Sequence, residues 1–166
     1  MNEDDALDNR IDKIHRTIEK CRYGIHDISR TQLNKEKLPR FNMPFELGIF
    51  FGAKRFGQNR QKLKNALILD KERFRFQQYI SDIAGVDIRS HNNDADQIVQ
   101  KVRSWLGTAS RRKLPGERHI GGHFAQFYIG LPKIVRALGI NGVSNLTFNE
   151  YCKLVEEYIE ANVPLN

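Results

Sequence analysis

The chain has no apolar run of about 18 residues, the length that a membrane-spanning helix needs. It opens on acidic residues, whereas a secretory signal opens on basic residues and continues with apolar ones. Only two cysteines occur, Cys21 and Cys152, and neither belongs to a Cys-x-x-Cys or Cys/His cluster. These absences argue against a secreted disulfide scaffold. They predict a cytoplasmic protein with two free thiols buried on helices.

The histidines do not indicate a metal centre. His91, His119 and His123 lack the spacing of metal ligands, and no Asp or Glu stands at a suitable interval. His26 precedes Asp27, but neighbouring strand residues point to opposite faces of a sheet, which argues against an acid/base pair. We therefore expect no bound metal, and a His26 that is structural or faces solvent.

The rest of the composition is that of one globular domain, with 166 residues, 40% of them hydrophobic and 28% charged. The net charge of +7 comes from 27 Lys and Arg against 20 Asp and Glu, and the basic residues concentrate in 54–75 and 103–118. This balance favours an anionic partner, whether nucleotide phosphates, nucleic acid or acidic lipid. We interpret the cluster Arg111-Arg112-Lys113 with Arg118 as a solvated loop in preference to a phosphate-binding one.

Apolar periodicity divides the chain into helices and short strands. Helical spacing predicts helices over 8–21, 44–55, 94–106 and 124–138, and a final helix that starts at a Thr147 capping box. Compact apolar runs predict strands over 22–28, 66–70 and 85–89. Residues 30–41 are expected to form a loop, 74–83 fit a helix or an irregular segment, and Pro132 is expected to break or kink its helix. Core positions include Trp105, Phe127, Tyr128, Phe148, Tyr151, Leu154, Val155 and Tyr158.

Helices that alternate with apolar strands are typical of an α/β protein with a parallel sheet. We expect the α/β core to span residues 1–106, followed by a basic linker over 107–123. Residues 124–166 are expected to form a C-terminal helical hairpin packed on the core. Three strands make a small sheet and the chain opens on a helix, so a first strand of the usual architecture is expected to be missing or hidden.

Polar residues follow the predicted strands where a ligand would bind. In open α/β sheets, ligands bind beyond the carboxyl ends of the strands, where helix N-termini gather. Five side chains are expected at that edge, namely Asp27, Ser29, Asn42, Glu46 and Asp70. A Glu46 in a first helical turn would stay ionised, and could act as a nucleophile or stabilise a cation. Such a carboxylate suits N-glycosidic cleavage, and nearby aromatic rings such as that of Phe45 could stack on a base.

A resemblance supports this interpretation. The segment Ile25-His26-Asp27-Ile28-Ser29, followed by Arg40-Phe41-Asn42-Met43-Pro44-Phe45-Glu46-Leu47-Gly48, resembles the strand-loop-helix signature of the nucleoside 2-deoxyribosyltransferase and TIR-like superfamily. The strand over 66–70 and the segment Ser81-Asp82-Ile83-Ala84-Gly85 are similar to bacterial TIR-like nucleotide-binding proteins. The resemblance covers about residues 8–106 and does not include the usual N-terminal strand with its nucleotide-holding loop.

The resemblance implies a Rossmann-like, flavodoxin-like three-layer sandwich with a small parallel sheet and additional C-terminal helices. It implies that Glu46 is the catalytic residue, and that Asp27 and Asn42 hold sugar hydroxyls. Further substrate contacts are expected from Ser29, Phe45 and Asp70. No cofactor is implied, because NAD or a nucleotide would be the substrate.

Three functions stay open from the sequence. The first is a nucleotide- or NAD-directed N-glycosidase or ribosyl-transfer protein that uses Glu46. The second is a non-catalytic nucleotide-sensing or self-associating module, so a homo-oligomer also stays open. The third is a nucleic-acid binder, for which the basic stretches are the sole support. The sequence favours a small nucleotide or NAD over nucleic acid, and no membrane partner is expected.

Overall fold

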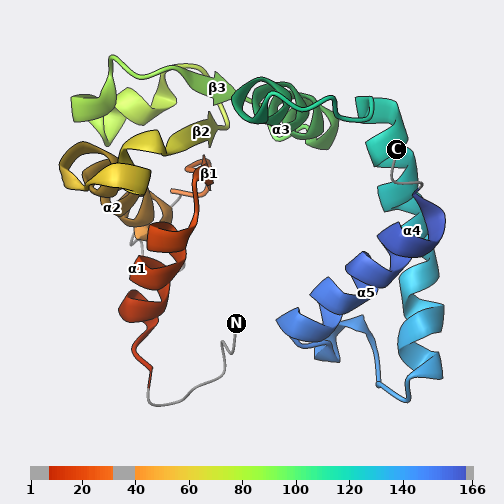
Figure 1. Cartoon of the computed structure of the whole chain (residues 1–166). Coiled ribbons are helices and arrows are strands. Elements are labelled where there is room, and N and C mark those ends of the chain that lie inside the picture. Colours follow the sequence, from red (N-terminus) through yellow and green to blue (C-terminus); the bar gives the residue numbers. More distant parts are fainter. Residues whose placement is uncertain (1–7, 32–39, 164–166) are drawn as a thin grey trace. The chain divides into compact units, whose positions relative to one another are not determined.

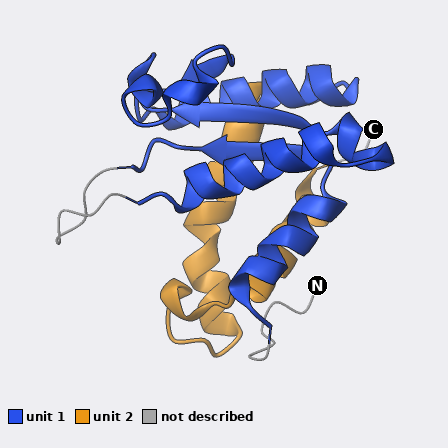
Figure 2. Cartoon of the chain, turned by 90° about the vertical axis from the view of Figure 1, so that its left-hand side faces the viewer, with its two compact units in different colours: residues 1–114 blue, residues 115–166 orange. Residues whose placement is uncertain are grey.

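The computed structural model describes residues 8–31 and 40–163, and Figure 1 follows its elements along the chain. The chain divides into two compact units, residues 1–114 and residues 115–166, which Figure 2 colours separately. Unit 1 contains α1 (Arg10–Lys20), β1 (Tyr23–Asp27), α2 (Asn42–Phe56), β2 (Asn65–Asp70), β3 (Ile88–Ser90) and α3 (Ala95–Ser110). Unit 2 contains α4 (Glu117–Ala137) and α5 (Phe148–Asn162). Short 3-10 helices are η1 (Asn59–Leu63), η2 (Arg75–Gln78), η3 (Ser81–Ile83) and η4 (Val143–Asn145).

The three strands form one parallel sheet in the order β1-β2-β3. His26 is in register with Ile68, and Leu69 is in register with Arg89. The predicted α/β class and its small parallel sheet are therefore confirmed. Because parallel strands share one direction, Asp27 and Asp70 end their strands at the same edge of the sheet.

Helices cover both faces of this sheet because neighbouring strand residues point to opposite sides. On one face, Ile28 and Ile68 pack with Leu47 of α2 and Phe76 of η2. On the other face, Leu67 and Leu69 pack with Trp105 of α3, as expected for Trp105. Residues 74–83, whose form the sequence left open, contain the 3-10 helices η2 and η3.

A buried lysine closes the carboxyl end of α1. Lys64 precedes β2, and its Nζ donates to the backbone carbonyls of Ile18 and Cys21. Burial lowers the pKa of the Lys64 ammonium, while the two carbonyls satisfy donors that would otherwise be buried alone. The Cys21 side chain is exposed, so its predicted burial is wrong, because α1 ends at Lys20 and Cys21 is its C-cap.

The start of α2 differs from the sequence expectation in a way that matters for the site. The helix begins at Asn42, with Phe41 as N-cap, and its first turn contains no acidic residue. Glu46 is therefore the fifth helical residue, one turn above Asn42, and not a first-turn residue as predicted. The helix dipole acts within the first turn, so it does not carry the argument for this carboxylate.

Unit 2 is a pair of helices around a small apolar cluster. Phe127, Leu131 and Val135 of α4 are buried, and Tyr151, Leu154, Val155 and Tyr158 of α5 are among the residues that pack against them. The predicted Thr147 capping box is present. Pro132 lies inside α4 without ending it. The sequence placed Tyr128 and Phe148 in the core, but both are exposed. Tyr128 is not among the α4 residues that pack in the cluster, and Phe148 is the first residue of α5.

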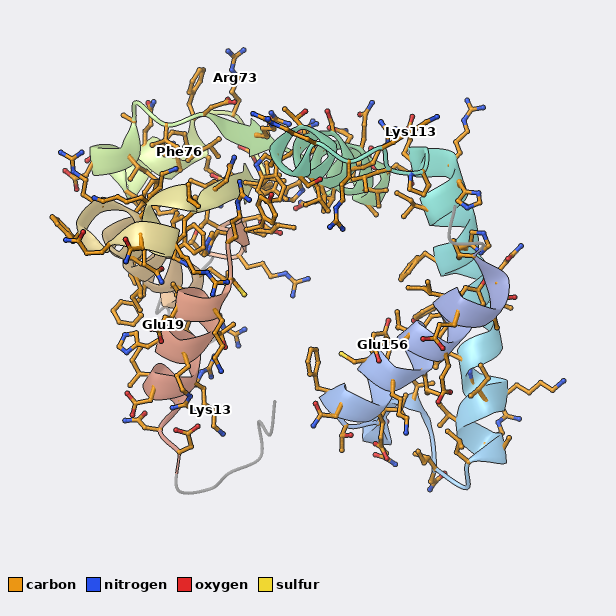
Figure 3. The ribbon with its side chains drawn as sticks, viewed as in Figure 1. Lys13, Glu19, Arg73, Phe76, Lys113 and Glu156 are labelled. Carbon is orange, nitrogen blue, oxygen red and sulfur yellow. The ribbon has the colours of Figure 1, made fainter. Side chains whose placement is uncertain are left out.

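The connection between the units is shorter than predicted. α3 continues to Ser110 and α4 begins at Glu117, so the predicted linker over 107–123 is mostly helical. The glycines of this segment do not prevent a helix, because one glycine in a helix costs only about 1 kcal/mol relative to alanine and the surrounding helical residues offset that cost. The segment left between the helices includes Lys113, labelled in Figure 3.

Candidate functional site

The central candidate is a cleft of about 310 Å³ between the N-terminal ends of α1 and α2. From α2 it is lined by Asn42, Phe45 and Glu46, three of the residues predicted for the site. Asn42 and Glu46 are four residues apart and thus share one helix face. The lining on the α1 side is Asn9, Arg10, Ile11 and Ile14.

The Glu46 carboxylate is available to a ligand. Glu46 is half-buried, and no hydrogen bond or ion pair joins its carboxylate to another residue within 8–31 and 40–163. Phe45 beside it is 58% exposed, so its ring offers a stacking surface at the cleft. An unpaired carboxylate next to an open aromatic ring and an amide is a set that can bind a base and a sugar.

The sequence did not predict Arg10 as part of the cleft. Its place on the polar side of an amphipathic helix predicts a solvent-facing side chain, and Arg10 is indeed exposed. The structure brings it to the same cleft as Glu46 because the start of α1 lies beside the start of α2. Nothing in the local pattern could have indicated this, since the two helix starts are about thirty residues apart. Arg10 supplies a cation that could bind a phosphate.

A second predicted group lies at the carboxyl end of β1. Asp27 Oδ1 accepts a hydrogen bond from the Ser29 backbone N–H at 2.9 Å. His91 Nε2 lies 3.4 Å from the same oxygen. The Asn93 backbone N–H donates to His91 Nδ1 at 3.1 Å, so that nitrogen carries the lone pair and Nε2 carries the proton. His91 therefore donates to Asp27, an arrangement that the sequence reasoning missed.

Asp70 is the centre of a closed network that ties the ends of two strands together. Arg75 Nε donates to Asp70 Oδ1 at 2.9 Å, and its Nη2 donates to the backbone carbonyls of Ile28 and Ser29 at the end of β1. The Tyr79 hydroxyl donates to Asp70 Oδ2 at 3.2 Å. Burial raises the pKa of Tyr79, which keeps this hydroxyl protonated. Asp70 is fully buried, so a contact with substrate would require this network to open.

His26 is buried against α2, so its predicted structural role fits better than a solvent-facing one. Its ring stands edge-on to Phe50, with centroids 5.1 Å apart. Neither ring nitrogen has a hydrogen-bond partner within the described residues. Burial lowers the pKa of His26 to about 4, so the ring is neutral at pH 7. A Cβ at Gly24 would lie 2.8 Å from His26 Nε2, which shows how tightly this contact is closed.

The predicted site is thus divided. Asn42, Phe45 and Glu46 share one cleft, while Asp27, Ser29 and Asp70 belong to the hydrogen-bonded groups at the strand ends. Within 8–31 and 40–163, no cluster of three or more His, Cys, Asp or Glu side chains could hold a metal ion, and no helix is long and apolar enough to cross a membrane. No protein-family model, curated protein or solved structure matches this chain.

Proposed function

We propose that this protein cleaves or transfers the N-glycosidic bond of a nucleotide or of NAD, with Glu46 as its catalytic residue. One observation carries the proposal. The Glu46 carboxylate has no partner among the described residues and lines a cleft together with an exposed aromatic ring. The small parallel sheet with helices on both faces supports a Rossmann-like, flavodoxin-like sandwich as the scaffold.

The chemistry follows from the residues that line the cleft. The bond between the sugar C1′ and the base nitrogen breaks, and its electron pair leaves with the base. The sugar becomes an oxocarbenium ion, which the Glu46 carboxylate stabilises or traps as an ester. Water, or an N–H group of a second acceptor base in a transfer reaction, then attacks C1′ and releases the carboxylate. The proton that the attacking group loses neutralises the departed base, or passes to solvent when the leaving group is the neutral nicotinamide of NAD. The protein needs no cofactor for this step.

The neighbours of Glu46 have distinct roles in this reaction. Phe45 stacks on the base, and the Asn42 amide binds a sugar hydroxyl. Arg10 pairs with a phosphate of the substrate. Asp27 does not line the cleft and lies at the carboxyl end of β1, and its part in the proposal is to bind a sugar hydroxyl with its second carboxylate oxygen, since Oδ1 is held by Ser29 and His91.

Incubation of the purified protein with a mixture of NAD and nucleotides tests the proposal. Mass spectrometry of the mixture before and after exposure should show one free base and the matching ribosyl product. Arg10→Gln should raise KM more than it lowers kcat, because the guanidinium contacts a phosphate away from the breaking bond. Unchanged levels of every compound in the mixture contradict the proposal.

A self-associating module is the second candidate, and the surface of unit 2 favours it. Phe124 and Tyr128 of α4 stack on each other and are 59% and 63% exposed. Ile129 is 79% exposed on the same helix. Exposed apolar side chains so close together are typical of an association surface. Sedimentation analysis of the wild type and of Phe124→Ser/Tyr128→Ser would show an oligomer that the double substitution dissociates. A monomeric wild type at all concentrations removes this candidate.

A further inference from the structure

A second cavity lies in unit 1 at the opposite edge of the sheet from Asp27 and Asp70. Its volume is about 610 Å³, and it lies beside the first residues of β1 and β2 and the carboxyl end of α3. It is on the α3 face of the sheet, since Trp105 lines it, whereas Leu47 of α2 packs on the other face. Three arginines line this cavity, Arg22, Arg89 and Arg111, and no acidic residue among those that the structure describes does.

Few contacts within unit 1 engage the guanidinium groups of these arginines, although the Arg22 guanidinium lies over the Tyr23 ring, 5.3 Å from its centroid. Arg75 is different, because its guanidinium donates hydrogen bonds to the Asp70 carboxylate, the Thr31 hydroxyl and the backbone carbonyls of Ile28 and Ser29. The side chains of Arg22, Arg89 and Arg111 donate no hydrogen bond to another residue within 8–31 and 40–163. Of the acidic residues that the structure describes, Asp87 alone forms an ion pair with one of these arginines, and its carboxylate is 4.0 Å from Arg89 and 88% exposed. A pair of that kind contributes little.

The remaining lining is fixed and polar. Trp105 Nε1 donates to the Asn65 side-chain carbonyl at 3.2 Å, and the Tyr23 hydroxyl donates to the Ala109 carbonyl at 3.1 Å. The hydroxyl residues Thr108 and Ser110 also line the cavity. These contacts hold the sheet and α3 in place around the cavity, so its shape does not depend on the arginines.

Arg111 occupies a position where another residue would be easier to accommodate. It ends α3 in the left-handed conformation, with φ 57° and ψ 29°. Glycine is the usual residue at such a helix end because it has no Cβ to clash there. An arginine at this position accepts backbone strain and brings a third guanidinium to the cavity. From the sequence, Arg111 was interpreted as a solvated loop residue, whereas in the structure it is the C-cap of α3 and lines the cavity.

We propose that this cavity binds a small molecule with two or more adjacent phosphates, through Arg22, Arg89 and Arg111. Guanidinium groups bind phosphate oxygens in pairs of parallel hydrogen bonds, and three of them around one cavity match a di- or triphosphate chain better than a single anion. The site is separate from the Glu46 cleft, and the inference does not depend on the proposed reaction.

Trp105 allows direct measurement, because it is the sole tryptophan of the chain and lines the cavity. Titration of the full chain with sodium triphosphate should change its fluorescence with a saturable curve, whereas orthophosphate should bind at least roughly tenfold more weakly. Binding should weaken as salt rises, since the contacts are ionic. ATP should compete with triphosphate if the phosphate chain is the recognised part.

Two substitutions separate binding from folding. Arg111→Gly should leave the melting temperature unchanged or raise it, because glycine suits the left-handed conformation, yet weaken triphosphate binding roughly tenfold. Arg60→Gln is the matched control, an exposed arginine outside the cavity that should bind as the wild type does. No saturable signal at low salt, equal losses in both variants, or a response to duplex DNA but not to triphosphate would overturn the proposal.

Discussion

The imidazole of His91 donates to the carboxylate of Asp27 across the carboxyl edge of the sheet, with Nε2 3.4 Å from Oδ1. The direction is fixed by the Asn93 backbone N–H, which occupies His91 Nδ1. His91 is buried, whereas the Asp27 side chain is 41% exposed. A buried residue thus orients an accessible one, and we assign His91 as a positioning residue.

Two amide substitutions should separate the two hydrogen bonds of His91. Glutamine places an amide N–H near the position of Nε2 and can still donate to Asp27, whereas asparagine places its oxygen near Nδ1 and loses that donation. His91→Asn should therefore lower kcat/KM for base release roughly tenfold, and His91→Gln should lower it less. Equal kinetics in the two variants, at equal thermal stability, would contradict a positioning role.

Protonation of His26 should make the fold sensitive to acid. Burial lowers the pKa of His26 to about 4 in the folded chain, against 6.5 for an ordinary histidine. Between these pH values the unfolded chain binds more protons, so stability is complete above pH 6.5 and falls as the pH drops towards 4. The loss is about 3 kcal/mol at its limit. Urea unfolding at pH 7.5 and 4.5 should show this loss in the wild type, and a much smaller loss in His26→Leu.

The Asp70–Arg75 pair should be essential to the fold. Arg75→Met leaves the Asp70 carboxylate buried without its cation and frees the carbonyls at the end of β1. The expected loss in the free energy of unfolding is about 3–5 kcal/mol. Chemical denaturation measures it, with Arg73→Met, an exposed neighbour labelled in Figure 3, as the matched control. A loss below 1 kcal/mol would mean that the network is not structural.

Lys64 should contribute by closing α1. Lys64→Met keeps the length of the side chain but leaves the carbonyls of Ile18 and Cys21 without their donor. The unfolding free energy should fall by about 1–3 kcal/mol, since two buried acceptors lose their partner. Lys153→Met, at an exposed position of α5, should change stability by less than about 0.5 kcal/mol.

The scaffold was predictable because its signals are local. Apolar runs at 22–28 and 66–70 identify β1 and β2. Asp94 caps α3, the helix predicted over 94–106, and Thr147 caps α5 as predicted. The strand predicted over 85–89 begins three residues later and ends one residue later, since β3 is short and its burial is only partial.

The site was predictable only in part because it depends on contacts between distant segments. Asn42, Phe45 and Glu46 could be grouped from one helix, and they do share a cleft. Arg10, His91 and the cavity arginines come from elements that the sequence gives no reason to join. The burial of Lys64 and His26 was likewise beyond a pattern argument, because polar residues seldom indicate the interior.

The central claim is that the Glu46 carboxylate stabilises the sugar cation while the base departs. The most direct measurement is the single-turnover rate of base release from the substrate identified in the NAD and nucleotide mixture. The wild type should be compared with Glu46→Gln and with Glu156→Gln, a control on α5 that Figure 3 labels. Glu46→Gln should reduce the rate by at least roughly a hundredfold with its circular dichroism and substrate affinity retained, while Glu156→Gln should match the wild type. Base release by Glu46→Gln at the wild-type rate would contradict the account.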